Sequence, residues 1–124
     1  MATKILIVED ELNISQMIQD VLKFEGFDTE TAFDGDEAIE KAHAAKPDLI
    51  TLDIGLPKKT GLEVLQSLKN DTHSMAIPVI IVSAQSQQTD IDKGLSLGAA
   101  RYMTKPCDPL KLVETIREIL ELPA

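Results

Sequence analysis

Carboxylate and hydroxyl side chains stand directly after aliphatic runs at three places in this sequence, and an ammonium side chain follows a weaker candidate strand. Glu9 and Asp10 follow the first run, Asp53 the second and Ser83 the third, and Lys105 follows residues 99–104. Three carboxylates brought together would repel one another, which raises some of their pKa values unless a cation neutralises them. A hard divalent ion meets that need, and Mg²⁺ is favoured over Ca²⁺ because few protein oxygens are on offer.

Asp53 stands alone after its run and is the best candidate for a nucleophile, because a carboxylate can form an aspartyl-phosphate. Lys105 would offset negative charge on the phosphoryl oxygens, and Ser83 would donate a hydrogen bond to one of them. Zinc is disfavoured, since neither His43 nor His73 follows a strand and no Cys/His ligand spacing is present. The pattern predicts Mg²⁺-assisted phosphoryl chemistry at Asp53.

Strands must bring these residues together, and the aliphatic runs are typical of strands covered on both faces in a parallel sheet. Residues 5–8, 49–52 and 79–82 are such runs. Residues 28–32 alternate as an edge strand would, and residues 99–104 are a weaker candidate. We therefore expect five strands.

The segments between and after the expected strands carry apolar residues at helical spacing. The first helical segment, which ends at Gly26, is expected to bury one face made of Ile14, Met17, Ile18, Val21 and Leu22. The last segment is expected to bury Leu112, Val113, Ile116, Ile119 and Leu120. A plausible, less periodic helix covers residues 87–97 and ends at Gly98.

Capping residues predict where three helices begin. Asp34 with Glu37, and Thr60 with Glu63, have the spacing that satisfies free amide groups at a helix start. Asp108 would cap the last helix, with a proline at its first position.

Strands that alternate with helices predict an α/β fold with a parallel sheet wound on both sides. Right-handed crossovers place the C-terminal ends of all strands at one edge, where such sheets bind ligands. The second strand runs into Ala32 and Phe33 rather than into polar residues, so we expect it at the sheet edge. The predicted fold is flavodoxin-like, with strand order 2-1-3-4-5, five helices and one domain over residues 1–124.

Four stretches along the whole chain form a highly specific set. They read Ile-Leu-Ile-Val-Glu9-Asp10-Glu11, Asp48-Leu-Ile-Thr-Leu-Asp53-Ile-Gly-Leu-Pro57 with Gly61, Val-Ile-Ile-Val-Ser83-Ala84, and Gly98-Ala99 leading to Tyr102-Met-Thr-Lys105-Pro106. Together they resemble the receiver domains of two-component response regulators, in their single-domain, chemotaxis-regulator-like form.

The resemblance implies that Glu9, Asp10, Asp53 and the backbone carbonyl of Gly55 bind Mg²⁺. It implies that Asp53 accepts a phosphoryl group from a histidine kinase or a histidine phosphotransfer protein. Ser83 and Tyr102 are similar to the family's switch pair. Lys105-Pro106 is similar to its cis peptide, and a proline must follow for such a bond to be favourable.

The same resemblance implies a phosphorylation-dependent signalling switch rather than an enzyme with an external substrate. The phosphorylated domain would change its surface toward an unknown protein target and slowly dephosphorylate itself. Both a stand-alone regulator and one domain of a longer protein fit this sequence.

The composition limits the cellular compartment and the partners that we expect for this protein. A single cysteine, Cys107, excludes an internal disulfide and reads as a small, partly buried hydrophobe. The longest apolar stretch, residues 77–82, is far shorter than the roughly 20 residues that span a bilayer, and no signal peptide opens the chain, so we expect a cytoplasmic protein with no membrane contact. The net charge of -9 opposes direct binding to nucleic acid.

Three other functions compete. A nucleotide or flavin module is weakly supported, because no Gly-rich phosphate loop follows the first strand. A phosphohydrolase would need a second acid two residues after Asp53, where Gly55 stands. A degenerate receiver that only binds proteins is opposed by the intact Asp10, Asp53, Ser83 and Lys105.

Some residues depart from the common family pattern or read as ordinary surface. Gly55, Lys58, Lys59 and Gln85 depart from it and bear on the lifetime of the phosphorylated form and on partner preference. Glu11 reads as surface charge, and His43 and His73, with no visible partner, read as structural or exposed. Without the family, Tyr102 reads first as a packing residue.

Overall fold

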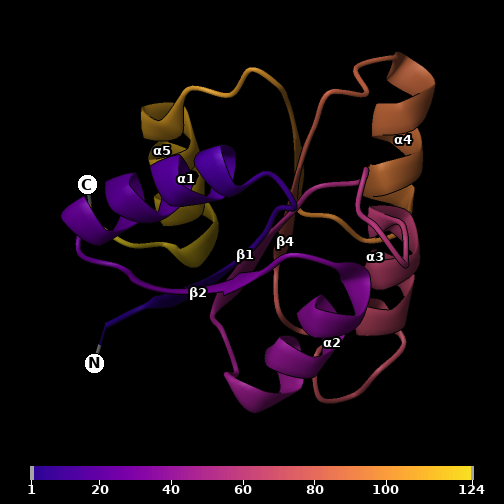
Figure 1. The fold of residues 1–124 in the computed structure, drawn as a ribbon, viewed down its shortest axis with the longest axis horizontal. Helices are drawn as coiled ribbons and strands as arrows, with labels where there is room; N and C mark the ends of the chain where they lie inside the picture. The colour runs from indigo at the N-terminus through magenta and orange to yellow at the C-terminus, as the bar shows by residue number, and fades with distance from the viewer. Residues whose placement is uncertain (1, 124) are drawn as a thin grey trace.

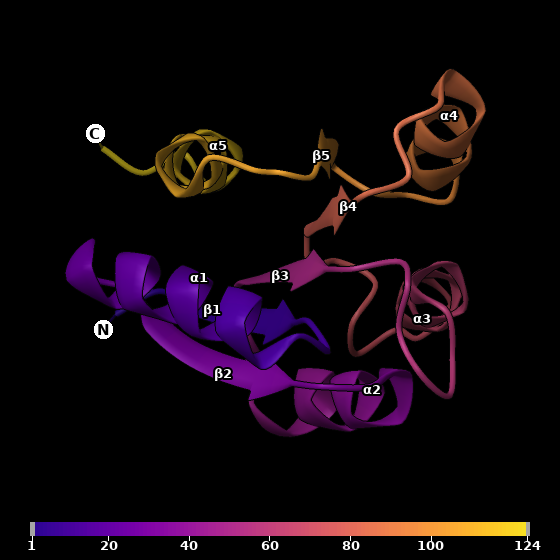
Figure 2. The same cartoon turned by 45° about the horizontal axis from the view of Figure 1, so that its top comes forward.

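The computed structural model describes residues 2–123 as one five-stranded parallel sheet with helices on both faces (Figures 1 and 2). The strand order is β2-β1-β3-β4-β5, which confirms the predicted topology. The elements in chain order are β1 (Lys4–Val8), α1 (Leu12–Phe24), β2 (Asp28–Ala32), α2 (Gly35–Ala44), β3 (Leu49–Leu52), α3 (Gly61–Lys69), β4 (Val79–Ser83), α4 (Gln88–Ser96), β5 (Arg101–Thr104) and α5 (Pro109–Leu120).

Two apolar clusters lie on opposite faces of the sheet. Figure 2 shows α1 and α5 over one face and α2, α3 and α4 over the other. The side chains of β1 alternate between the clusters, with Ile5 and Ile7 facing α1 and α5, and Leu6 and Val8 on the other side. Every residue of β3 and β4 is buried, as expected for strands covered twice.

The predicted helix starts are confirmed by hydrogen bonds. The Asp34 carboxylate accepts from the Glu37 amide at 2.8 Å, and the Asp108 carboxylate accepts from the Leu110 amide at 3.0 Å. Thr60 and Glu63 form a reciprocal capping box at the start of α3.

The expectation that Met17 lies on the buried face of α1 is wrong. Ile18 and Leu22 pack on the sheet, whereas Met17 is 43% exposed. Adjacent helical residues point about 100° apart, so Met17 falls at the margin of the packed face. It borders a hollow between α1 and α5 that Pro106 and Cys107 also line.

His43 and His73 are both exposed, which agrees with the sequence-based interpretation, and both also contact one carboxylate. His43 Nε2 lies 3.0 Å from Asp71 Oδ2, and His73 Nδ1 lies 3.2 Å from Asp71 Oδ1. The loop after α3 brings Asp71 to the end of α2, a contact that sequence spacing does not reveal. Within residues 2–123, no helix is both long and apolar enough to cross a membrane.

Candidate functional site

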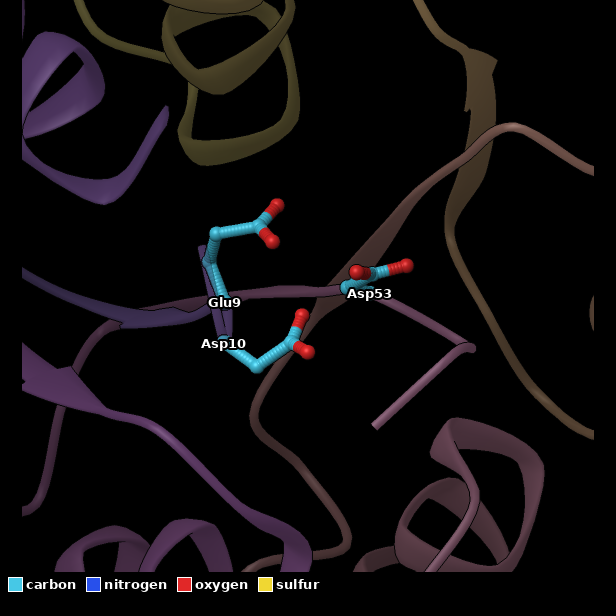
Figure 3. A group of neighbouring side chains, drawn as sticks. All are labelled: Glu9, Asp10 and Asp53. Carbon is cyan, nitrogen blue, oxygen red and sulfur yellow. The ribbon is translucent and has the colours of Figure 1, made fainter. Parts of the chain in front are cut away.

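Adjacent strands β1 and β3 place the acidic residues at one edge of the sheet. Val8 and Leu52 are register partners, and Glu9 and Asp53 are the next residues of their chains. The Asp53 amide donates to the Val8 carbonyl at 3.0 Å, which ties the two strand ends together. One carboxylate oxygen from each of Glu9, Asp10 and Asp53 lies within 4.8 Å of the others (Figure 3).

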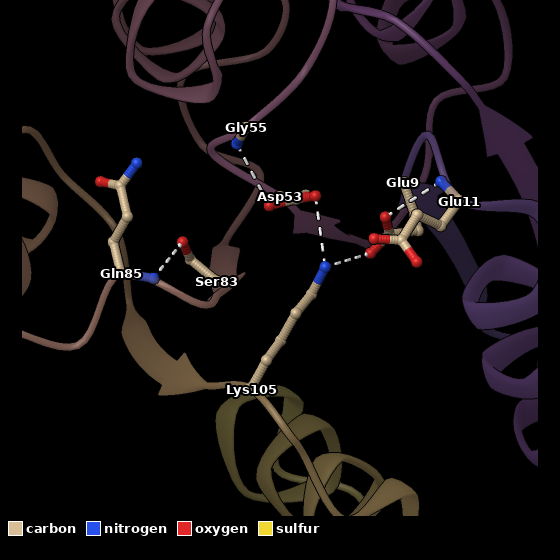
Figure 4. A network of polar contacts seen from close by, with 7 residues as sticks. All are labelled: Glu9, Glu11, Asp53, Gly55, Ser83, Gln85 and Lys105. Carbon is tan, nitrogen blue, oxygen red and sulfur yellow. Dashed lines mark hydrogen bonds and ion pairs between the residues drawn. The ribbon is translucent and has the colours of Figure 1, made fainter.

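Lys105 directly follows β5, and its side chain reaches two of these carboxylates (Figure 4). Its ammonium nitrogen lies 2.8 Å from Glu9 Oε1 and 3.2 Å from Asp53 Oδ2. The Lys105 amide donates to the Ser83 carbonyl at 2.8 Å, and the Lys105-Pro106 peptide bond is cis. The hydrogen bond to Ser83 holds the lysine backbone beside the end of β4.

The charges in this cluster do not balance, because three carboxylates face one ammonium group. Burial raises the pKa of Glu9, and the bond from Lys105 offsets only part of that effect. Burial alone would lower the pKa of Lys105, but its bond to Glu9 and the charge of Asp53 outweigh burial and raise it. The site is therefore short of positive charge.

Carboxylate oxygens are the ligands that Mg²⁺ prefers, and few of them are needed when water completes the shell. The exposed Asp10 faces solvent while Glu9 and Asp53 are buried, so the cluster opens on one side. The donor set and the negative excess both fit a hard divalent cation.

Asp53 is held by backbone groups on both sides. The Gly55 amide donates to Asp53 Oδ1 at 3.2 Å, and the Gly61 amide donates to the Ile54 carbonyl at 2.8 Å. A Cβ atom on Gly61 would overlap the Asp53 carbonyl oxygen and lie 2.5 Å from the Ile54 Cα. The start of α3 therefore packs directly on the Asp53 backbone, which requires glycine there.

Ser83 and Tyr102 are joined through the backbone of Gln85. The Gln85 amide donates to Ser83 Oγ at 3.1 Å, and the Tyr102 hydroxyl donates to the Gln85 carbonyl at 2.6 Å. Burial raises the pKa of Tyr102. Ser83 is 2% exposed at the end of β4, the strand that pairs with β3, whereas Tyr102 is only partly buried.

Sequence reasoning singled out most of these residues but missed two of their contacts. It assigned Lys105 to phosphoryl oxygens, whereas here the ammonium group binds Glu9 as well as Asp53. It considered Gln85 for its side chain, whereas the structure uses its backbone. The Gln85 contacts leave no signal in residue type, because any residue other than proline at position 85 has the same amide and carbonyl.

Comparison with known proteins gives a consistent result. A family model described as the response regulator receiver domain matches residues 5–117. The alkaline phosphatase synthesis transcriptional regulatory protein PhoP of Bacillus subtilis is 42% identical over 120 residues, which are 97% of this chain and 49% of PhoP. The phosphate regulon transcriptional regulatory protein PhoB of Escherichia coli is 38% identical over 120 residues, 97% of this chain and 52% of PhoB. The chain spans about half the length of these curated relatives.

Solved structures share the whole fold. A CheY-like receiver domain protein from Methanospirillum hungatei superposes with a TM-score of 0.91 at 30% identity, over 98% of this chain and 95% of that one. The chemotaxis response regulator CheY4 of Vibrio cholerae gives a TM-score of 0.90 at 29% identity, over 96% of this chain and 99% of that one.

Proposed function

We propose that this chain, which belongs to the response regulator receiver domain family, is a switch that accepts a phosphoryl group on Asp53. The observation that carries the proposal is the buried Asp53 carboxylate, 3.2 Å from the Lys105 ammonium group and beside two further acids. That arrangement supplies a nucleophile, a cation and a binding place for a second cation in one spot.

The phosphoryl donor is a histidine kinase or a histidine phosphotransfer protein. A carboxylate oxygen of Asp53 forms a bond to phosphorus as the bond from phosphorus to the donor's imidazole nitrogen breaks. The imidazole leaves with that electron pair and takes up a proton. Catalysis of such a transfer rests on positioning and on charge stabilisation, since the transferred group is already anionic.

Each neighbour of Asp53 has a role in this transfer. Glu9, Asp10, Asp53 and the Gly55 carbonyl would hold Mg²⁺, which would supply charge neutralisation for the phosphoryl oxygens. Lys105 moves from its two carboxylates toward a phosphoryl oxygen, and Ser83 donates a hydrogen bond to another. Water later hydrolyses the acyl phosphate in a slow reaction of the domain on itself, with no external substrate.

The output is a changed surface for a protein partner. Ser83 and Tyr102 act as the switch pair, because the Gln85 backbone already links them. The net charge of -9 makes direct contact of this domain with nucleic acid or an anionic membrane unfavourable. We assign residues 1–124 to one receiver domain that acts in the cytoplasm. It acts either by itself or as part of a longer protein, as in the transcriptional regulatory proteins PhoP and PhoB.

The test is the intact mass of the protein after incubation with acetyl phosphate and MgCl₂. One phosphoryl group should be added per chain, and EDTA or Asp53→Asn should prevent it. Asp48→Asn, which changes another acid near β3, should leave it intact. Addition to Asp53→Asn at the wild-type rate would refute the assignment, and repeated turnover of a phosphate monoester would favour a phosphohydrolase instead.

A further inference from the structure

Gly94 in helix α4 faces a crowded part of the sheet. It is the only residue of α4 that is buried, and it lies over β4 and β5. An ideal Cβ built on Gly94 would be 2.7 Å from Ile81 Cδ1, 3.0 Å from Tyr102 Cδ2 and 3.2 Å from Tyr102 Cε2. A side chain at this position would therefore occupy space that the Tyr102 ring and the tip of Ile81 now fill.

Backbone conformation does not explain this glycine. Among residues 2–123, positive φ angles in glycine occur only at Gly26 and Gly98, so Gly94 has an ordinary helical backbone. Glycine is a poor helix former, and alanine would stabilise an isolated α4. The space left for its two neighbours is the remaining physical reason.

Those two neighbours lie side by side in the sheet. Ile81 and Tyr102 are register partners of β4 and β5, and in parallel pairing register partners point to the same face. Ile81 is fully buried, whereas Tyr102 is only partly covered. When a Cβ is added at Gly94, the ring of Tyr102 is therefore the neighbour that is free to move toward solvent.

The ring position controls one hydrogen bond. The Tyr102 hydroxyl reaches the Gln85 carbonyl at 2.6 Å, and the Gln85 amide donates to Ser83 Oγ at 3.1 Å. Displacing the ring by even a fraction of its width would break the first bond, because hydrogen bonds weaken quickly beyond about 3.2 Å. The contact at Gly94 is therefore linked through Tyr102 and the Gln85 backbone to Ser83. Ser83 ends the strand that pairs with β3, after which Asp53 stands.

We propose that Gly94 is a positioning residue which keeps the Tyr102 ring seated between α4 and the sheet, and so sets how Tyr102 responds to phosphorylation of Asp53. The second clause rests on the function proposed above, whereas the first concerns the unphosphorylated protein alone. Gly94 touches no reacting atom, so its effect runs entirely through Tyr102.

Tyr102 is the only tyrosine and the chain has no tryptophan, so tyrosine fluorescence and phenol absorbance report this ring alone. In Gly94→Ala we expect stronger acrylamide quenching of the fluorescence. We also expect the phenol pKa, which burial raises in the wild type, to shift down toward the ordinary value of 10.0. Phosphorylation of Asp53 by acetyl phosphate should keep its wild-type rate, while the fluorescence change that accompanies it should shrink.

Two further variants separate positioning from general damage. Ser96→Ala alters an exposed residue of the same helix and should change neither the quenching nor the phenol pKa. Ile81→Val removes the Cδ1 atom nearest to the added methyl group, so Ile81→Val/Gly94→Ala should recover part of the wild-type quenching and phenol pKa. A purely structural loss would instead grow when a second core residue is cut back.

The two parts of the proposal fail differently. Wild-type quenching and phenol pKa in Gly94→Ala would overturn the positioning role of Gly94. If the variant moves the ring as expected but wild-type fluorescence does not change on phosphorylation, the switch role of Tyr102 is wrong and the contact at Gly94 still holds. If Gly94→Ala alone does not fold, the comparison of Ile81→Val with Ile81→Val/Gly94→Ala decides the first part by the same readouts.

Discussion

At the scale of single residues, the site is organised around Lys105. Its ammonium group pairs with the carboxylates of Glu9 and Asp53 at once. The Lys105 side chain is 17% exposed, and those of Glu9 and Asp53 are 3% and 10% exposed. Breaking a buried pair by removing one partner leaves a charge uncompensated and is far more costly than losing a surface pair. We therefore expect the proposed movement of Lys105 toward a phosphoryl oxygen to depend on a cation that would compensate Glu9 and Asp53 in its place.

Ser83→Ala should retain phosphorylation of Asp53 at a reduced rate and lose much of the conformational response. One hydrogen bond to a charged group is worth roughly 1.5–3 kcal/mol, enough for about a tenfold to hundredfold change in the population of two states. The measurement is the change in amide chemical shifts of residues 87–105 on phosphorylation. Ser86→Ala, an exposed hydroxyl in the same loop, is the control. A full response in Ser83→Ala would show that this hydroxyl does not couple the site to the surface.

Glu9 should give the metal-free protein a distinct pH dependence. Burial raises the pKa of Glu9 in the folded state above the ordinary value of 4.5. At a pH between these two pKa values, the folded state holds a proton that the unfolded chain has already lost. Its contribution to stability is fully present below that ordinary value and is lost as pH rises toward the folded pKa. Urea unfolding in EDTA should therefore show Glu9→Gln gaining on the wild type as pH increases from 4.5 toward neutrality. Parallel stability curves would contradict the assignment.

At the scale of elements, the loop between β3 and α3 is anchored at two points, its far end and its middle. Its far end packs on the Asp53 backbone through Gly61, and its middle packs on the start of α2, where a Cβ on Gly35 would lie 2.6 Å from the Lys59 Cβ. An ion pair of 3.4 Å between Lys58 and Asp34 adds to that contact, although Lys58 is 62% exposed and the pair contributes little. Close packing at Lys59 therefore holds this loop against α2 more firmly than the exposed ion pair of Lys58 does.

Gly61→Ala should destabilise the protein by about 1–3 kcal/mol, the usual cost of overpacking, because the atoms it meets belong to backbone and cannot turn away. It should also slow phosphorylation by displacing Asp53. Gly55→Ala is the matched control, since no atom lies within 4 Å of a Cβ at that position. Its stability should stay within about 0.5 kcal/mol of the wild type. Equal losses in urea unfolding of both variants would mean that close packing at Gly61 is not the cause.

At the scale of the whole molecule, one sheet edge collects acids that the rest of the fold neutralises only in part. The chain carries a net charge of -9, and three of its carboxylates converge within 4.8 Å. Repulsion among them opposes folding in the absence of a cation. Keeping these acids together therefore lowers the stability of the metal-free fold, as the proposed Mg²⁺ site implies.

Mg²⁺ should raise the thermal unfolding midpoint, and Asp10→Asn should remove most of that rise. A ligand that binds only the folded state stabilises it by about 2.7 kcal/mol at a hundred times its dissociation constant. The variant should also be slightly more stable than the wild type in EDTA, because one repelling charge is gone. Glu11→Gln, at the adjacent exposed acid outside the cluster, should retain the full Mg²⁺ effect. A Mg²⁺ effect that survives in Asp10→Asn would place the ion elsewhere.

The sequence by itself determined the architecture. Unbroken aliphatic runs require cover on both faces, caps such as Asp34 and Thr60 locate helix starts, and right-handed crossovers bring all strand ends to one edge. The convergence of Glu9, Asp10, Asp53, Ser83 and Lys105 on that edge follows from topology. Each of these features follows from a local pattern of residues or from a general rule of chain geometry.

Only the tertiary structure decided which atoms touch. Lys105 and Glu9 are 96 positions apart in the chain, and their contact depends on how two strand ends and a side chain meet in space. The pairing of Asp71 with His43, the exposure of Met17 and the fit of Gly94 against Tyr102 depend likewise on how helices rotate and settle on the sheet. Periodicity fixes which face of a helix is apolar, but not the few ångströms of translation and rotation that select each neighbour.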